Sequence, residues 1–170
     1  MSTLYVDNLQ PNLGSRVMAA GHVVQVVSQE FTNQTSTTST SMVSTGIALS
    51  IAPSSTSSKI LISVKGLMGT GTGYFSYFTL DRDGTNIGSS TGQTGSYTGY
   101  LNYMARPVSV DNSGATNFSF ETLDSPSSTS TLTYTLQYCV NSGGTVTVGR
   151  RNSDTQVKSP TTITLMEIAQ

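Results

Sequence analysis

The chain has little of what most catalytic and secreted proteins depend on. Its 170 residues include one cysteine, one histidine and no tryptophan, and only 10% are charged. Cys139 alone cannot form an intrachain disulfide, so stability must come from the core or from oligomerisation. One histidine and one cysteine cannot build a zinc site. We therefore expect no metal and no cofactor.

The chain also lacks an excess of positive or negative charge and any long stretch of apolar residues. Eight basic residues face nine acidic ones, for a formal net charge of −1, and no basic run could follow a phosphate backbone. No apolar run approaches the roughly 20 residues that cross a bilayer, and the N-terminus lacks the pattern of a signal peptide. The composition disfavours nucleic-acid binding and membrane insertion, and the sequence indicates synthesis in a cytoplasm without export by the usual route.

Serine and threonine are abundant where charged residues are few. The chain has 27 serines and 27 threonines, which give a neutral surface typical of proteins in large assemblies or outside cells. Segments of period two, separated by turn residues, predict strands. The predicted strands are residues 22–32, 44–51, 59–67, 74–82, 85–88, 97–104, 115–123, 131–140, 145–149 and 162–168. This pattern predicts an all-β antiparallel sandwich or jelly roll over residues 21–170.

Two local features complete this organisation. Asp83 and Gly84 lie between two predicted strands, which indicates a tight hairpin whose central residues need positive φ. Residues 1–20 differ from the rest and are interpreted as an extended arm that lies on another protein. The apolar positions of this anchoring arm are Leu4, Tyr5, Val6, Leu9 and Leu13.

The first and last predicted strands are apolar on both faces. They contain "HVVQVV" and "ITLMEIA", whereas the other strands keep one polar face. In jelly rolls of the tumour-necrosis-factor-like kind, these two strands pair within an inner sheet whose second face packs around a threefold axis. Burial of each valine, methionine or isoleucine is worth about 1.5–3 kcal/mol. We expect a homotrimer interface at Val23, Val24, Val26, Val27, Ile163, Leu165, Met166 and Ile168. The alternative is that a loop or the arm covers this face within one monomer.

Several segments resemble known proteins. "MSTLYVDNLQ", "GHVVQVVS", "SIAPSSTSSKILI", "LDSPSSTSTLTYTLQY" and "TITLMEIA" are similar to stretches of small β-rich virion proteins and tail-fibre end domains of marine and cyanobacterial phages. The resemblance implies a homotrimeric structural protein of a phage virion, attached to a capsid or tail protein. The shortness of the arm favours a compact knob or capsid decoration over a complete tail fibre.

Residues that could carry chemistry lack supporting motifs. His22 stands alone at a strand entry, so a structural or surface role is favoured over a catalytic triad. Asp81, Asp83 and Thr85 suggest a calcium loop, but Gly84 comes at the fourth position of that loop rather than the sixth. The carboxylates Glu30, Glu121, Asp124 and Glu167 are too scattered to support a glycosidase pair. We expect no enzymatic activity.

Aromatic residues gather around glycine-rich stretches in the middle of the chain. Tyrosine rings beside hydroxyl and amide groups can form a platform for a host surface glycan, which would make the protein a receptor-binding fibre tip. Packing in the core or in an interface is the favoured alternative, because the chain has no tryptophan to fill large spaces. The candidate glycan contacts are Tyr74, Tyr97, Tyr100 and Tyr103.

Overall fold

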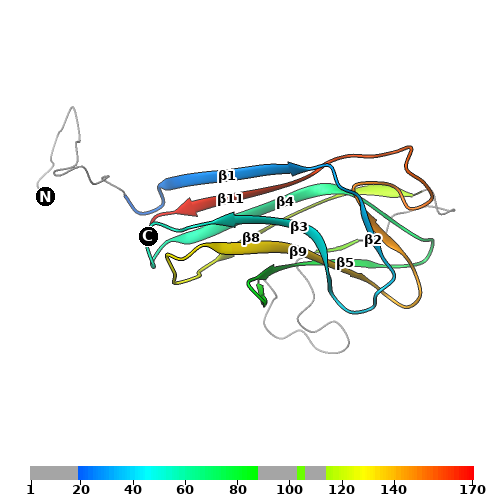
Figure 1. Cartoon of the computed structure of the whole chain (residues 1–170), viewed down its shortest axis with the longest axis horizontal. Helices are drawn as coiled ribbons and strands as arrows, with labels where there is room; N and C mark the ends of the chain where they lie inside the picture. The colour runs from blue at the N-terminus through cyan, green and yellow to red at the C-terminus, as the bar shows by residue number, and fades with distance from the viewer. Residues whose placement is uncertain (1–18, 88–102, 106–113) are drawn as a thin grey trace, which may run out of the picture.

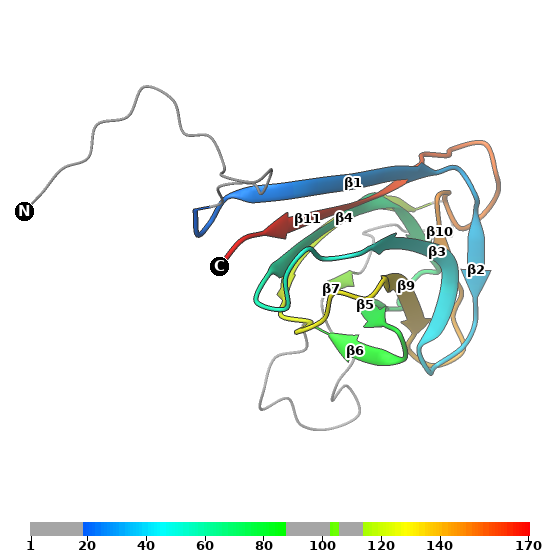
Figure 2. The same ribbon diagram turned by 60° about the vertical axis from the view of Figure 1, so that its left-hand side comes forward.

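The structure is a computed structural model, and it describes residues 19–87, 103–105 and 114–170. These residues form two antiparallel sheets (Figures 1 and 2). One sheet contains β1 (Val23–Phe31), β2 (Thr35–Thr37), β4 (Lys59–Thr70), β8 (Ala115–Asp124), β10 (Val146–Val148) and β11 (Thr161–Ile168). The other contains β3 (Val43–Ile51), β5 (Ser76–Arg82), β6 (Thr85–Ile87), β7 (Tyr103–Ala105) and β9 (Leu132–Val140). Within the described ranges, no helix is long and apolar enough to cross a membrane.

The strand order is that of a jelly roll. β1, β11, β4 and β8 are neighbours in one sheet, and β3, β9, β5 and β7 are neighbours in the other. The chain passes repeatedly from one sheet to the other, as two interlocked Greek keys require. The expected all-β sandwich is confirmed, and so is the expected pairing of the first strand with the last, β1 with β11.

Most predicted strands match observed ones within a few residues. β2 was missed, because its sequence "TST" has no apolar periodicity and it is held by backbone pairing with β10. Of the strand predicted at residues 97–104, only the part that overlaps β7 lies among the described residues.

The core lies between the sheets and follows the period-two pattern. In β9, alternate side chains from Leu132 to Val140 point inward and are buried. Phe78 of β5 and Phe118 of β8 stack across the sandwich with ring centroids 4.6 Å apart. This contact joins the two sheets at the centre of the core.

The predicted hairpin between β5 and β6 is confirmed. Asp83 and Gly84 have φ of 48° and 89°, the left-handed values that a tight turn of this kind requires. The Gly84 N–H donates to Asp81 Oδ1 at 2.9 Å, so one of the aspartates considered for calcium instead stabilises the turn.

The two ends of the described domain lie side by side. The Gly21 N–H donates to the Ala169 carbonyl at 2.7 Å, and the Ala169 N–H donates to the His22 carbonyl at 2.9 Å.

The loop at residues 149–160 lies at the far end of the long axis (Figure 1). There the Arg150 guanidinium donates to the carbonyls of Arg151 and Asn152, which holds the loop closed.

Candidate functional site: the outer face of the β1–β11–β4–β8 sheet

The outer face of this sheet carries a row of apolar side chains that crosses four strands. The register pairs Val26 with Met166, Met166 with Leu61, and Leu61 with Leu123. Val26 is 54% exposed and Leu123 is 51% exposed. Beside this row, Val23 pairs with Ile168. We call these six residues the apolar patch: Val23, Val26, Leu61, Leu123, Met166 and Ile168.

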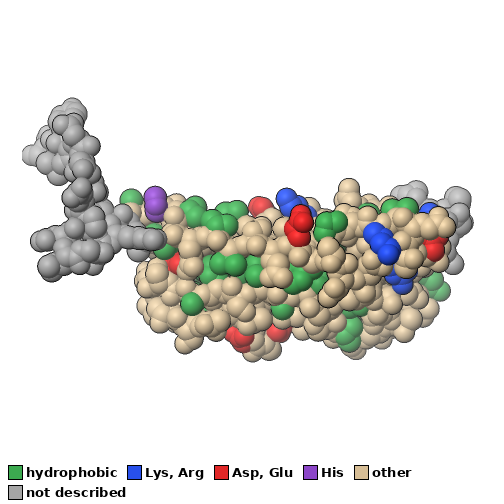
Figure 3. All heavy atoms as spheres, turned by 45° about the horizontal axis from the view of Figure 1, so that its top comes forward, with side chains coloured by type: hydrophobic (Ala, Val, Ile, Leu, Met, Phe, Trp, Pro, Cys, Tyr) green, Lys and Arg blue, Asp and Glu red, His purple; other side chains and the backbone are tan. Residues whose placement is uncertain are grey.

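Toward the C-terminal end of β1, the side chains on this face become polar. The next row consists of hydroxyl groups and one carboxylate, and the Ser28 hydroxyl lies 2.8 Å from that of Thr164. The row after it is charged at Glu30 and Lys65. Charged side chains are sparse on the surface in Figure 3, where hydrophobic side chains gather near His22. The apolar patch is therefore a local feature at the end of the sheet where β1 begins.

The eight residues predicted to form the trimer interface fall into two groups in the structure, one in the core and one outside it. Ile163 and Leu165 are fully buried in the core between the two sheets of the same chain, so placing them in an interface was wrong. Val27 packs against the same core. The prediction counted both faces of each strand, whereas the opposite sheet already covers the inner one.

The remaining members lie outside that core. Val23, Val26, Met166 and Ile168 occupy the outer face, and Val24, beside a β-bulge, is partly buried. Leu61 and Leu123 were missed, although both alternate with inward-facing residues in their strands and so had a detectable signal. These two residues extend the apolar row from β1 and β11 to β4 and β8.

Glu167 is a buried carboxylate at the end of β11. Its side chain is fully buried and shares the inward face of β11 with Ile163 and Leu165. Oε1 accepts from the Ser54 N–H at 2.8 Å, the Ser54 hydroxyl at 2.6 Å and the Ser58 hydroxyl at 2.7 Å. Oε2 accepts from Gln25 Nε2 at 2.7 Å. Sequence reasoning treated Glu167 as one of several scattered acids and missed this role.

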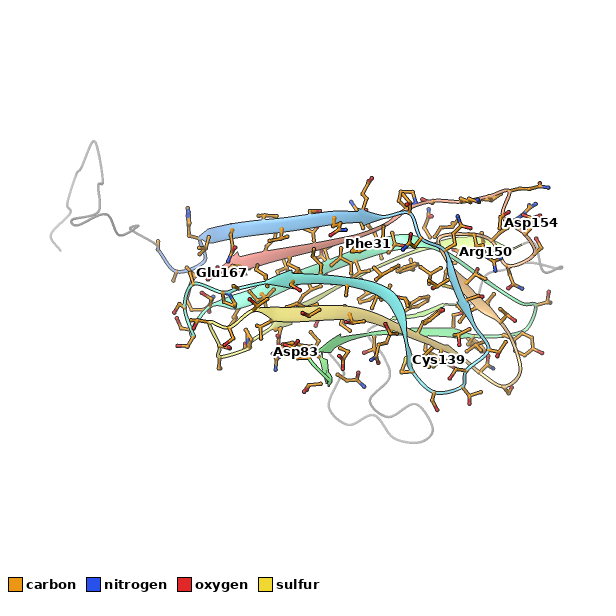
Figure 4. All side chains as sticks on the ribbon, viewed as in Figure 1. Phe31, Asp83, Cys139, Arg150, Asp154 and Glu167 are labelled. Carbon is orange, nitrogen blue, oxygen red and sulfur yellow. The ribbon has the colours of Figure 1, made fainter. Side chains whose placement is uncertain are left out.

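The hydrogen bonds set the charge state of Glu167. Burial raises the pKa of the carboxyl, but the donors from Ser54, Ser58 and Gln25 outweigh it and lower the pKa below its ordinary value. The carboxylate therefore stays ionised at neutral pH, and the donors described here are all uncharged groups. It ties β1 and the loop at residues 52–58 to β11, at the end of the molecule opposite Arg150 and Asp154 (Figure 4).

The other candidates for chemistry have structural surroundings. Asp124 is buried; it accepts from the Tyr134 hydroxyl at 2.8 Å and pairs with Arg82, and these two partners stabilise the buried carboxylate. Burial raises the pKa of the Cys139 thiol to about 11, so it is protonated at neutral pH and is a poor nucleophile. His22 is exposed. In the described ranges, no three His, Cys, Asp or Glu side chains are grouped to hold a metal ion.

The tyrosines considered for glycan binding are only partly described. Tyr74 packs against the core, and its ring lies where a side chain at Gly144 would be, so its contacts are those of a packing residue. Tyr97 and Tyr100 lie outside the described residues, and only the backbone of Tyr103 is described. The arm residues Leu4, Tyr5, Val6, Leu9 and Leu13 also lie outside them.

A shallow depression of about 370 Å³ lies next to the charged row. Lys65, Thr162 and Ser119 line it from three neighbouring strands, together with Asn117 and Pro160. Its lining offers an ammonium, hydroxyls and an amide, but no carboxylate, histidine or thiol to serve as a base or nucleophile. The described lining therefore suits hydrogen bonding to a polar ligand.

Comparison with protein-family models and with curated proteins finds no match. Solved structures similar to this chain include the VP2 subviral particle of infectious bursal disease virus, with 15% identity and a TM-score of 0.41. The Gx strain structure of that virus has 13% identity and a TM-score of 0.42, and the Gt strain structure has 12% and 0.40. Each match covers 98% of this chain but only 42–43% of the other, so this chain spans less than half the length of those proteins. A similarity this weak assigns the chain neither a family nor a function.

Proposed function

We propose that this protein is a non-enzymatic structural component of a phage particle. It forms a homotrimer through the outer face of the β1–β11–β4–β8 sheet, and residues 1–20 attach it to a capsid or tail protein. The observation that carries the proposal is the apolar patch. Of the four large hydrophobic side chains exposed among the described residues, three, Val23, Val26 and Leu123, belong to this patch.

Energetics favour self-association through the patch. Full burial of an exposed valine or leucine is worth about 1.5–3 kcal/mol, so each of these half-exposed side chains contributes about half of that. A cyclic trimer buries three copies of every such side chain. The flanking rows are polar, as is usual at the rim of an interface. A chain without disulfides gains stability from such contacts, because binding to the folded state shifts the folding equilibrium.

The placement on a virus particle is supported by sequence resemblance and by composition. The segments similar to phage virion proteins overlap β1, β9 and β11 of the observed sandwich. The hydroxyl-rich surface with few charges suits a protein that is packed among many others. The described domain is a single β-sandwich, as a knob or decoration protein requires.

The oligomeric state tests this proposal directly. Sedimentation velocity of the wild type at micromolar concentration should give a species of three times 17.9 kDa. Met166→Asp should give monomers or aggregates, because a carboxylate cannot be buried unpaired in the interface. Thr56→Asp, on an exposed loop, is the matched control and should stay trimeric. A fully folded wild-type monomer at this concentration would contradict the proposal.

A second candidate function is recognition of a host surface glycan. The depression beside Lys65 favours it, since hydroxyl, amide and ammonium groups are those that bind sugar hydroxyls and carboxylates. Binding of purified lipopolysaccharide to the isolated protein tests it. Loss of binding in Asn117→Ala would locate the site in the depression, and loss in Tyr100→Ala would locate it in the tyrosine-rich segment. Absence of binding in the wild type would eliminate this function.

A further inference from the structure

The outer face of the β1–β11–β4–β8 sheet carries four charged side chains, two of each sign. They are Lys59, Lys65, Glu30 and Glu121. Within the described part of the chain, ion pairs form at Arg82–Asp124 and Arg151–Asp154, and none involves these four residues. A face that is neutral overall but has unpaired charges of both signs is suited to meeting a copy of itself.

Glu30 and Lys65 lie at the same level along the strand direction on this face. Glu30 pairs with Thr162 across β1 and β11, and Thr162 pairs with Lys65 across β11 and β4. Two strand spacings of about 4.8 Å separate their backbones. Both side chains are exposed. Along β4, Lys65 is four residues from Leu61 of the apolar patch, or roughly 13 Å at about 3.3 Å per residue.

If the copies are related by a rotation axis parallel to the strands, each residue keeps the same level along the strand direction in every copy. Each row of one copy then meets the same row of the next, so the apolar patch meets apolar patches and the charged row meets charged rows. The charged row presents an acid on the outermost strand and a base two strands further in. A twofold axis perpendicular to the strands reverses the strand direction. It brings the charged rows of two copies together only if it passes through the charged row itself.

From this placement we infer that Glu30 of one copy pairs with Lys65 of the next. The inference rests on the proposed trimer and specifies its register. The apolar patch drives association, and the ion pairs about 13 Å away fix how far one copy is shifted along its neighbour. Such pairs serve mainly to select one arrangement, because wrong alignments bring like charges together.

Charge exchange tests the pair in the full-length chain. Glu30→Lys and Lys65→Glu should each raise the protein concentration needed for half-trimerisation by about tenfold, because each change places like charges together. The double variant restores opposite charges and should recover most of the wild-type value. These three variants are compared by sedimentation equilibrium at low and high salt, and the differences should shrink at high salt.

Glu121→Lys is the matched control. Glu121 lies on the same face, diagonal to Lys65 within one copy, and has the same charge as Glu30. It should change trimerisation much less, and combining it with Lys65→Glu should not restore the trimer. Circular dichroism of every variant confirms that the domain is folded.

The outcomes separate this inference from the proposed function. A wild type that does not trimerise overturns both. A wild-type trimer whose Glu30→Lys and Lys65→Glu variants trimerise normally, or whose double variant is no better than either single, overturns the ion pair alone. Rescue by Glu121→Lys instead of Glu30→Lys also overturns the Glu30–Lys65 pair.

Discussion

Glu167 occupies a position where the strand pattern calls for an apolar side chain. Removing a carboxylate from water is costly unless hydrogen bonds replace its hydration. Two serine hydroxyls, one backbone N–H and one glutamine amide supply them here, all between 2.6 and 2.8 Å. Gln25 Nε2 also donates to the Ala52 carbonyl at 2.7 Å, which extends the network to the end of β3.

This network makes stability depend on pH in a defined direction. The pKa of Glu167 is lower in the folded protein than its ordinary value near 4.5. The stabilisation is therefore fully present above that ordinary value and is lost as the pH falls through the folded-state pKa. Urea unfolding of wild type and Glu167→Gln should differ by about 1.5–3 kcal/mol at neutral pH, since bonds to an ionised acceptor are lost. The difference should shrink below about pH 4.

Glu121→Gln provides the control for this measurement, because Glu121 is exposed on the outer face. Its unfolding free energy should stay within about 0.5 kcal/mol of the wild type. A gap between wild type and Glu167→Gln that is constant from neutral to acidic pH would show that ionisation of Glu167 contributes nothing.

Among the elements, β4 and the loop at residues 149–160 depend on a glycine. A Cβ at Gly69 would lie 2.4 Å from the backbone nitrogen of Asn152 and 2.8 Å from Thr147 Oγ1. The Thr147 hydroxyl also accepts from the Gly69 N–H and donates to the Arg150 carbonyl, so the loop is bound closely to this part of β4. Only a residue without a side chain permits this approach.

Gly69→Ala should therefore displace the loop. We expect the free energy of unfolding to fall by about 1–3 kcal/mol, as in other overpacked sites, and the loop to become more sensitive to trypsin at Arg150 and Arg151. Ser63→Ala, on the outer face of the same strand, is the comparison and should change neither quantity much. Unchanged stability and proteolysis in Gly69→Ala would mean that the loop accommodates a methyl group without moving.

The elements also show what the sequence could and could not predict. β9 was predictable because one of its faces meets the core, so apolar and polar residues alternate. β2 has no such alternation, and the pairing that creates it involves a distant strand. The outward apolar residues Leu61 and Leu123 become meaningful only through register, which aligns them with Val26 and Met166. The burial of Glu167 depends on a loop more than a hundred residues away in the chain.

At the scale of the whole molecule, the described domain has a core of its own between its two sheets. Among the described residues, the Ala19 carbonyl accepts from the His22 N–H at 3.1 Å, and the core cluster runs from Val27 to Leu165. Folding and attachment are thus separable tasks under the proposed function. The domain provides the oligomer, and the arm provides the attachment.

Deletion of residues 1–18 tests this division of roles. The truncated chain should keep the unfolding temperature and the trimer of the full-length protein, because none of the described core contacts is removed. It should lose binding to particles that lack this protein, measured by co-sedimentation. Full binding by the truncated protein would place the attachment elsewhere on the domain.

The hydrogen bonds that join Gly21 and His22 to Ala169 have a practical consequence for engineering. A peptide fused behind Gln170 would emerge next to Gly21, on the side that we propose faces the virion, and would be hidden there or would block docking. A peptide inserted near Ser153 would emerge at the opposite end of the long axis. Foreign epitopes intended for display to the immune system belong at that distal tip.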